Sequence, residues 1–358
     1  MRLFADIYRG KRVLITGHTG FKGSWLCLWL NELGAHVTGI ALAPKTQPNH
    51  WDLLGLGVNE HRLDIRDAES VRLALKEVNP DIVFHLAAQP LVRRSYFEPL
   101  VTWSTNVMGT ANVLEACRQS PSVRAIVSIT TDKCYENREW SWGYRECDRL
   151  GGHDPYSASK AASEIVAASY RNAYFNGENS PLLATARAGN VIGGGDWSED
   201  RLIPDLVRSV AQDQSLEIRS PFATRPWQHV LECLSGYLQL GQRLLQGEKA
   251  YADAWNFGPE QEGNRTVSEV LGELSAHWTS LRWHVADQPQ PHEAALLYLD
   301  SGKARSQLLW RPAWTIGTTM AKTAEWYRDW LEGGKVTSRE QLVGYLAAAT
   351  RAKMEWAV

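Results

Sequence analysis

Three consecutive residues, Thr131, Asp132 and Lys133, place a hydroxyl, a carboxyl and an amine side by side. They follow "AIVSI", an apolar run with the composition of a buried β-strand. Together they offer a hydrogen-bond donor, an acid and a base, the groups that a reaction with several proton transfers needs. A surface turn is the alternative interpretation, and the rest of the chain has to decide between the two.

A second pair, Tyr156 and Lys160, lies in "DPYSASKAAS", four residues apart on an Ala- and Ser-rich helix that Pro155 could start. A nearby ammonium group stabilises phenolate, so we expect the tyrosine pKa to fall from about 10 toward the working pH. The phenol could then remove a hydroxyl proton while hydride leaves the carbon. Thr131, the end of a neighbouring strand, is expected to hydrogen-bond the oxygen being oxidised. A solvated helix face is the alternative.

The stretch "RVLITGHTGFKGSWL" places Gly17, Gly20 and Gly23 directly after a strand and at the opening of a helix. Glycines permit a tight turn and a close backbone approach, while the amides at the helix start receive a pyrophosphate. The sequence therefore predicts a dinucleotide site at the turn between the first expected strand and the helix that follows it.

Composition excludes several classes of function. The 358 residues are 44% hydrophobic and 22% charged, with a net charge of -2, so neither nucleic acid nor a membrane surface is an expected partner. No secretory signal or transmembrane run is evident, which predicts a cytoplasmic protein. The five cysteines form no CxxC pair, so we expect neither a disulfide framework nor a metal site.

The first half alternates short β-branched runs with helical patterns, which predicts βαβ units in a doubly wound parallel sheet of the Rossmann type. "LLATARAGNVIG" is the last expected strand of this half. We expect residues 1–190 to form the dinucleotide-binding domain, with segments near 230–258 returning to it. Residues 191–358, rich in Gly, Asp, Pro and Trp connections, are expected to form a smaller α/β substrate-binding domain.

The glycine spacing resembles that of the extended short-chain dehydrogenase/reductase family. This resemblance implies NAD as cofactor, with Asp64 at the adenine. The second strand, "HVTGIALAPKT", ends without the acidic residue that usually bonds the ribose, and Lys45 is the only cation near it for a 2′-phosphate. The family positions implied to bind the cofactor are Gly17, Gly20, Phe21, Gly23, Asp64, Ile65, Leu86, Ala87, Gln89, Asn106, Tyr156 and Lys160.

Within that family, nucleotide-sugar 4,6-dehydratases carry Thr-Asp-Glu or a similar triplet where this chain has Thr131, Asp132 and Lys133. Oxidation alone, or 4-epimerisation, has no use for Asp132 and Lys133. Together with "TGHTGFKGSWL", "RAGNVIGGGDW" and "RPWQHVLE", the triplet most resembles the dehydratases that act on CDP-glucose. The resemblance runs from about residue 8 to about residue 335.

The resemblance implies a reaction in three steps. Tyr156 takes the C4 hydroxyl proton as NAD accepts the C4 hydride, and Lys133 then removes the C5 proton. Asp132 protonates the departing C6 hydroxyl, and hydride returns to C6, giving a 4-keto-6-deoxy sugar. Lys133 must be neutral and Asp132 protonated, far from their usual pKa values of about 10.4 and 3.9. A plain ion pair between them is the alternative.

Family likeness also suggests the substrate contacts. Arg225 matches the position that holds the diphosphate, Asn190 a position near the nicotinamide, and Arg94 with Ser95 a substrate loop. A second arginine of many relatives is not evident, and His292 and Glu293 lie in that region. His18 and His85 are expected to pack or hydrogen-bond rather than catalyse.

The leading hypothesis is therefore an NAD-dependent hydro-lyase acting on CDP-glucose or a related nucleotide-diphosphate hexose. A 4-epimerase, or a dehydratase for another nucleotide sugar, is the nearest alternative, and a noncatalytic dinucleotide sensor is a further one. Retention of Thr131, Tyr156 and Lys160 argues against the sensor. A homodimer or homotetramer is expected, joined through helices near 100–118 and 157–175.

Overall fold

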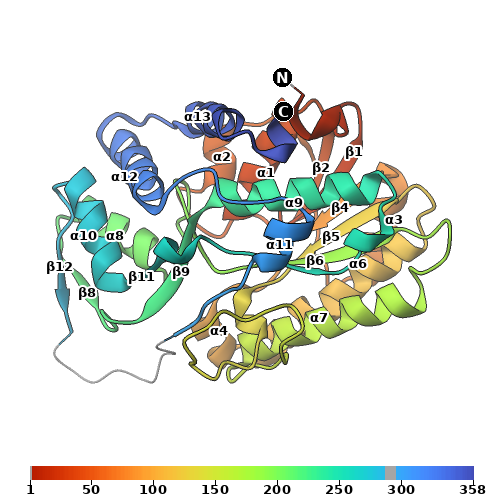
Figure 1. The fold of residues 1–358 in the computed structure, drawn as a ribbon, viewed down its shortest axis with the longest axis horizontal. Helices are drawn as coiled ribbons and strands as arrows, with labels where there is room; N and C mark the ends of the chain where they lie inside the picture. The colour runs from red at the N-terminus through yellow and green to blue at the C-terminus, as the bar shows by residue number, and fades with distance from the viewer. Residues whose placement is uncertain (1, 287–295) are drawn as a thin grey trace.

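A parallel sheet of seven strands forms the centre of the protein, and the computed structural model describes residues 2–286 and 296–358. The strand order is β10–β6–β5–β4–β1–β2–β3 (Figure 1). The strands are β1 (Arg12–Thr16), β2 (His36–Ala41), β3 (Asn59–Arg62), β4 (Ile82–His85), β5 (Ala125–Ile129), β6 (Leu182–Ala188) and β10 (Ala254–Phe257). The order reverses between β1 and β4, where doubly wound sheets bind ligands. The predicted fold class is confirmed.

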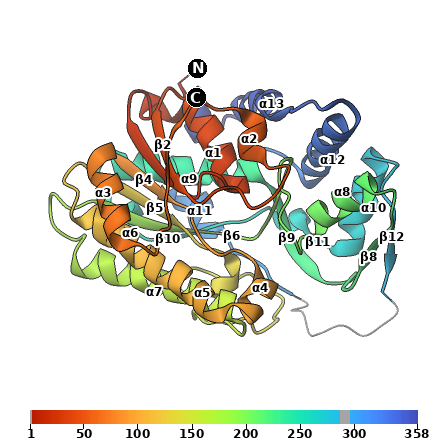
Figure 2. The same ribbon diagram turned by 180° about the vertical axis from the view of Figure 1, so that it is seen from behind.

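The central strands of the sheet are buried on both faces, because successive apolar residues point to opposite sides of the sheet. In β1, Val13 and Ile15 belong to one hydrophobic cluster and Leu14 to another. The first cluster includes α1 (Phe21–Glu32) and α9 (Val230–Leu245). The second includes α3 (Ala68–Val78), α6 (Gly109–Arg118) and α7 (Pro155–Ala173). Figures 1 and 2 show α9 in front of the sheet in one view and α3 with α6 in front of it in the other.

Helix α7 begins where the sequence predicted. Pro155 is its first residue, and the side chain of Asp154 caps it by accepting a hydrogen bond from the backbone of Ser157. Beside α7, the helices α4 (Val92–Phe97) and α5 (Pro99–Trp103) lead through a π-helical turn at Ser104–Met108 into α6. Such turns are frequent at functional sites.

Two smaller sheets lie at one end of the large one (Figure 1). One has the order β11–β9–β7 and the other pairs β12 with β8. Their strands are β7 (Asn190–Ile192), β8 (Leu216–Ile218), β9 (Thr224–His229), β11 (Asn264–Thr266) and β12 (Trp283–Val285). The helices around them are α8 (Leu202–Ala211), α10 (Val267–His277) and α12 (Ile316–Gly333). Between these segments the chain returns to the large sheet, where α9 packs on it and β10 pairs with β6.

The expected strand "LLATARAGNVIG" is in fact two strands in different sheets. β6 ends at Ala188 and β7 starts at Asn190, so the chain changes sheets at Gly189. A Cβ at Gly189 would lie 2.5 Å from the Pro226 ring and 3.1 Å from Oδ2 of Asp132. The crossing therefore occurs beside the predicted catalytic triplet, where a glycine is needed for the close approach.

Strand β3 was not predicted, because its sequence "NEHR" has no apolar residue. It forms the edge of the sheet and pairs with β2 through backbone hydrogen bonds, with Ala41 opposite Arg62. The remaining helices are α2 (His50–Leu54), α11 (Gly302–Gln307) and α13 (Ser338–Arg351). Within residues 2–286 and 296–358, none of the helices has both the length and the apolar character needed to cross a bilayer.

Candidate active site

The glycine turn between β1 and α1 forms a cradle without side chains. Gly17 has a φ of +79°, and a Cβ there would lie 2.7 Å from the backbone nitrogen of Ala87. A Cβ on Gly23 would lie 2.1 Å from the carbonyl oxygen of Gly17. No side chain caps the start of α1 at Gly20, so its first amides are available to a phosphate. Together with Phe21, the first residue of α1, these glycines fit the pyrophosphate of a dinucleotide.

The ends of β2 and β3 form the expected adenosine side of this cradle. The carbonyl oxygen of Leu42, just after β2, accepts hydrogen bonds from Thr19 and from Arg62, at 3.0 and 3.1 Å. Arg62 also pairs with Glu60, which contacts the buried His18 at 3.0 Å. The expectation that Lys45 is the only nearby cation is wrong. Arg62 comes from β3, which the sequence did not reveal, and lies beside the end of β2.

The segment after β4 holds the backbone of the cradle in place. The amide of Ala87 donates to the hydroxyl of Thr16 at 3.1 Å, and the amide of Leu86 donates to its carbonyl. His85 is buried between the hydroxyls of Thr16 and Thr110, and burial lowers its pKa to about 3. The histidine is therefore neutral and hydrogen-bonded, in agreement with its expected packing role.

Asn106, in the π-helical turn, clamps the chain at Gln89. Its side chain accepts from the amide of Gln89 at 2.8 Å and donates to the carbonyl of Gln89 and the hydroxyl of Ser159. These bonds occupy the Asn106 amide, so we expect it to act on a cofactor through the backbone of Gln89. Of the other predicted positions, Ile65 is buried against Gly109 and Asp64 forms an ion pair with Arg66 at 2.6 Å.

The triplet forms a short 3₁₀ turn at the end of β5. The hydroxyl of Thr131 donates to Oδ1 of Asp132 at 2.9 Å, and the other carboxylate oxygen has no hydrogen-bond partner among the described residues. Asp132 is 2% exposed, and burial raises its pKa, an effect that the charges of Lys133 and Arg225 oppose. The Lys133 side chain is half-buried and forms no ion pair with Asp132. The alternative of a plain ion pair is therefore absent from this arrangement.

Tyr156 and Lys160 face the triplet from α7. The hydroxyl of Thr131 lies close enough to the phenol of Tyr156 to lower its pKa, and the ammonium of Lys160 donates to the carbonyl of Ile129 at 3.3 Å. Burial lowers the pKa of Lys160 to about 8. The expected lowering of the Tyr156 pKa is not found: burial raises it to about 12, although Thr131 and Arg201 oppose this shift. Here the cost of desolvating a phenolate exceeds the attraction of the neighbouring cations.

The predicted substrate residues lie on both sides of this cluster. Arg225, in β9, is buried and close enough to influence Asp132 electrostatically. Asn190 begins β7, directly after the crossing at Gly189. Arg94, in α4, pairs with Glu98 at 2.8 Å, and the buried hydroxyl of Ser95 donates to a backbone carbonyl of the same helix. His292 and Glu293 lie outside the described residues.

Two basic residues near the cluster were not predicted. Lys22, in the first turn of α1, has its amine 3.4 Å from the Tyr237 hydroxyl and affects the pKa of both Asp132 and Lys160. Arg201 pairs with Asp196 at 2.9 Å and affects the pKa of Tyr156. The signal for Lys22 was a lysine at the start of an otherwise apolar helix. Nothing in the sequence distinguished Arg201 from surface charges.

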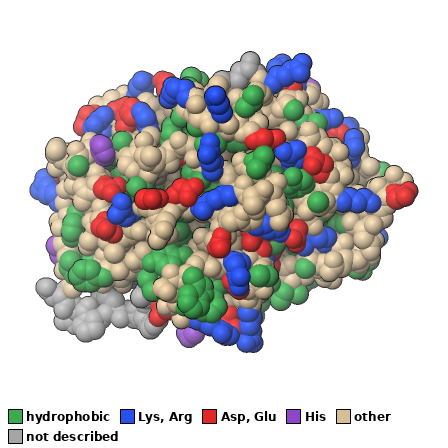
Figure 3. All heavy atoms as spheres, in the orientation of Figure 1, with side chains coloured by type: hydrophobic (Ala, Val, Ile, Leu, Met, Phe, Trp, Pro, Cys, Tyr) green, Lys and Arg blue, Asp and Glu red, His purple; other side chains and the backbone are tan. Residues whose placement is uncertain are grey.

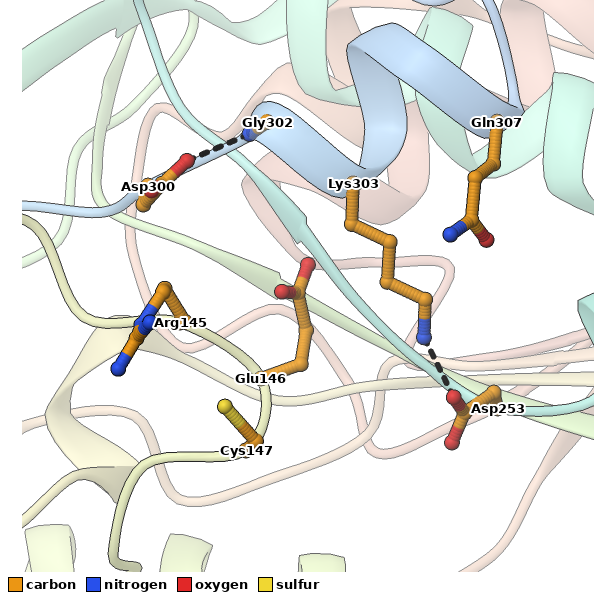
Figure 4. A pocket seen from close by; sticks show the side chains of 8 residues that line it. All are labelled: Arg145, Glu146, Cys147, Asp253, Asp300, Gly302, Lys303 and Gln307. Atoms are coloured by element: carbon orange, nitrogen blue, oxygen red, sulfur yellow. Dashed lines mark hydrogen bonds and ion pairs between the residues drawn. The ribbon is translucent and has the colours of Figure 1, made fainter.

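A pocket of about 580 Å³ opens elsewhere, beside β10 and α11 (Figure 4). Two of its charged groups already have partners: Lys303 points toward Asp253, and Asp300 accepts from the amide of Gly302. None of the predicted catalytic or cofactor residues lines it, so we assign the chemistry to the β5–α7 cluster. The lining residues are Arg145, Glu146, Cys147, Asp253, Asp300, Gly302, Lys303 and Gln307.

Charge is distributed evenly over the face drawn in Figure 3, where acidic and basic side chains are interspersed. Among the described residues, no group of three or more His, Cys, Asp or Glu side chains is arranged to hold a metal ion. The chemistry that remains is that of a dinucleotide cradle beside a phenol, an ammonium group, a hydroxyl and a buried acid.

The protein has a doubly wound sheet, a glycine turn after β1, and Tyr156 and Lys160 at the start of α7. This combination defines an extended short-chain dehydrogenase/reductase. The pattern of the family described as GDP-mannose 4,6 dehydratase matches residues 14–323, so the chain belongs to this family of nucleotide-sugar dehydratases. The predicted family resemblance is confirmed.

Individual relatives agree with this assignment. The chain is 47% identical to the CDP-glucose 4,6-dehydratase of Salmonella typhimurium, over 97% of this chain and 99% of the relative. It is 26% identical to the dTDP-glucose 4,6-dehydratase of Xanthomonas campestris, over 89% of this chain and 95% of the relative. Among solved structures it resembles DesIV, a dTDP-glucose 4,6-dehydratase from Streptomyces venezuelae with NAD bound. The TM-score is 0.74 and the identity 25%, covering 88% of this chain and 97% of DesIV.

Proposed function

We propose that the protein is an NAD-dependent CDP-glucose 4,6-dehydratase. The proposal rests on family membership, on the 47% identity to the Salmonella enzyme, and on one structural observation. The buried acid Asp132 and the amine of Lys133 occupy the same turn as Thr131, which contacts the phenol of Tyr156. An enzyme that only oxidises and reduces C4 needs Tyr156, Lys160 and Thr131, whereas elimination of water also needs an acid and a base.

Oxidation at C4 would use the residues of α7 and the end of β5. When bound, NAD would supply the acceptor for the C4 hydride and the donor of the hydride that returns to C6, and would bring a positive charge to the site. Such a charge favours phenolate and would oppose the effect of burial on Tyr156. Tyr156 takes the C4 hydroxyl proton, Thr131 orients that oxygen, and Lys160 supports both from one turn further along α7.

Elimination would use the other two members of the triplet. The new 4-keto group makes the C5 hydrogen acidic, and Lys133, as the neutral amine, removes it. Asp132 donates its proton to the C6 hydroxyl, which leaves as water. The raised pKa of the buried Asp132 supports this acid role. After hydride has returned to C6, a proton returns to C5 and the product is CDP-4-keto-6-deoxyglucose.

The substrate would lie between the large sheet and the β7–β9 sheet. Arg225 in β9 and Asn190 in β7 would hold the diphosphate and the linked sugar, and Arg94 with Ser95 would border the hexose. Arg201 adds a guanidinium on the same side, near Tyr156. This placement supports residues 1–190 with 230–258 as the cofactor-binding domain and 191–358 as mainly the substrate-binding domain.

The end of β2 supplies no carboxylate for the ribose, so the glycine cradle supports a dinucleotide but does not select NAD over NADP. Glu60 is the carboxylate nearest to that strand end, and it is engaged by His18 and Arg62. Asp64, Ile65, Leu86, Ala87 and Gln89 would line the adenosine and nicotinamide halves. Solved relatives such as DesIV carry NAD, which supports NAD over NADP despite the cation at Arg62.

We propose a homodimer or homotetramer whose subunits are joined through the α4–α6 region and α7. Phe97 and Leu100 are 86% and 81% exposed, and Met108 and Ile165 are more than half exposed. Large apolar side chains on one helical region are typical of an association surface. Light scattering should show a dimer or tetramer for the parent. A Leu100→Asp/Met108→Asp variant should give a smaller species.

One incubation tests the activity. The purified protein is supplied with NAD and, in separate samples, with CDP-, dTDP-, UDP- and GDP-glucose, and the products are examined for an alkali-induced 4-keto absorbance and for epimers. We expect the 4-keto-6-deoxy product from CDP-glucose. A 4-epimer, a preference for another nucleotide, or no turnover with any of them would each refute the proposal and indicate an epimerase, another dehydratase or a sensor.

A further inference from the structure

A buried ion pair lies directly behind the catalytic triplet. Arg187, in β6, donates to both oxygens of Glu164, in α7, at 2.9 and 2.8 Å, and both side chains are 3% exposed. Thr130, the residue directly after β5, and Thr185, in β6, donate to the same carboxylate. Burial would raise the pKa of Glu164, but the guanidinium and the hydroxyls hold it below its usual value. The carboxylate is therefore charged and fully hydrogen-bonded.

This pair holds the chain on both sides of the triplet. Thr130, which donates to Glu164, immediately precedes Thr131. Tyr135, two residues after Lys133, accepts from the Arg187 guanidinium at 2.7 Å, and its ring lies 5.0 Å from the guanidinium carbon. Tyr135 in turn donates to Asn256 of β10 at 2.8 Å. The turn that carries the acid and the base is thus fixed at its start by Glu164 and at its end by Arg187.

The same pair also sets the turn relative to α7. Glu164 follows Lys160 by one helical turn, and Lys160 donates to the carbonyl of Ile129. Hydrogen bonds therefore join α7 to the chain on both sides of the triplet. Lys160 bonds Ile129 and Glu164 bonds Thr130, and Arg187, the partner of Glu164, bonds Tyr135. Tyr156, on the first turn of α7, cannot shift against the triplet while these bonds are intact.

We propose that Glu164 and Arg187 are positioning residues for elimination: their ion pair fixes the Asp132–Lys133 turn over C5 and C6 of the hexose. This proposal rests on the proposed dehydratase function. Neither residue touches the substrate, and the pair acts through Thr130 and Tyr135. C4 oxidation depends less on it, because two of its three residues, Tyr156 and Lys160, belong to one rigid helix and only Thr131 belongs to the turn. The acid Asp132 and the base Lys133 of the elimination both lie on that turn, which is held by its two ends.

A purely structural role is the alternative, since buried ion pairs commonly serve only packing or specificity. Thr185 provides a matched control. Its hydroxyl bonds the same carboxylate at 2.7 Å and is fully buried like that of Thr130, but it lies in the middle of β6, away from the triplet. Thr130→Val and Thr185→Val therefore remove the same kind of bond from the same acceptor, and only the first lies next to the catalytic turn.

The experiment compares two steps in each variant of the full-length enzyme with CDP-glucose and NAD. Single-turnover absorbance of reduced nicotinamide reports C4 oxidation, and deuterium incorporation at C5 with formation of the 4-keto-6-deoxy product reports elimination. In Thr130→Val and Tyr135→Phe we expect elimination to slow about 10- to 100-fold while C4 oxidation changes less than about 3-fold, as for a misplaced catalytic group. Thr185→Val should keep the parent ratio of the two rates, and Thr130→Ser should restore it.

If Thr130→Val and Thr185→Val slowed both steps equally, and the loss followed the fall in melting temperature, the positioning role would be overturned. The proposed function would still stand, provided that the parent forms the 4-keto sugar. A parent that forms no 4-keto sugar from any nucleotide sugar would overturn the proposed function, and this proposal with it. Tyr135→Phe remains informative if Thr130→Val does not fold, because it removes only a hydroxyl at the outer end of the turn.

Discussion

The hydroxyl of Thr131 donates a 2.9 Å hydrogen bond to Oδ1 of Asp132, its neighbour in the chain, and Oδ2 of that carboxyl has no partner among the described residues. An acid that is buried and only half satisfied is costly to ionise. The arrangement therefore favours a protonated Asp132, with the Thr131 hydroxyl between it and the phenol of Tyr156.

Replacing the base should separate the steps of the reaction. In Lys133→Met we expect C4 oxidation within about 3-fold of the parent and C5 exchange slowed at least about 100-fold, the usual contribution of a general base. Reduced nicotinamide should then accumulate. Mass spectrometry of sugar recovered from heavy water measures C5 exchange directly, and exchange at the parent rate would exclude Lys133 as the base. Lys335→Met, an exposed residue after α12, is the control.

The acid predicts a pH dependence. Burial raises the pKa of Asp132, so the proton needed at C6 is present at low pH and is lost as the pH rises through that pKa. The elimination rate of the parent should fall on that alkaline limb. Asp132→Asn should be about 100-fold slower and lack the limb, because an amide does not titrate. Stopped-flow rates of nicotinamide reoxidation between pH 5 and 9 check this, and an identical limb in the variant would contradict the assignment.

The glycine cradle predicts a steric effect on cofactor binding. Gly23→Ala would place a methyl group 2.1 Å from the Gly17 carbonyl oxygen, so the turn must move. We expect NAD affinity to fall more than about 10-fold and stability to fall by about 1–3 kcal/mol. Gly317→Ala, in the first turn of α12, meets no atom within 4 Å and should leave NAD binding unchanged. Titration calorimetry measures the NAD affinity of each variant and of the parent. Equal NAD affinities for Gly23→Ala and the parent would show that the turn can adapt.

A buried carboxyl away from the site predicts how stability depends on pH. Glu232, in α9, accepts from the amides of Ala313 and Trp314 and from the Tyr345 hydroxyl, at 2.9, 2.7 and 2.6 Å. Burial nevertheless raises its pKa to about 7. The folded state therefore binds this proton more tightly than the unfolded chain, and the stability that the neutral carboxyl provides is lost as the pH rises from about 4.5 to about 7.

Glu232→Gln does not titrate, so its stability relative to the parent should rise by up to about 3 kcal/mol across that pH range. Urea unfolding at several pH values measures the difference. Glu77→Gln, at an exposed position in α3, should show a difference that changes by less than about 0.5 kcal/mol. A difference for Glu232→Gln that is independent of pH would mean that folding does not raise the pKa of this carboxyl.

The sequence determined the large sheet, the glycine turn and the helix of Tyr156 and Lys160, because each depends on local rules. Apolar strand runs, three glycines at fixed spacing, and Asp154–Pro155 before an Ala-rich stretch act over a few residues. The same rules missed β3, whose polar residues pair only through the backbone, and joined β6 to β7 across Gly189.

Tertiary structure alone decided which charges meet. Arg62 reaches the end of β2 because β3 pairs beside it, and Lys22 approaches Asp132 from a helix more than 100 residues earlier in the chain. The pKa of Tyr156 was predicted to fall because its neighbour Lys160 is visible in the sequence, but burial is not visible there and raises it. Spacing along the chain fixes which groups are available, whereas desolvation and contacts between distant strands fix their protonation and their partners.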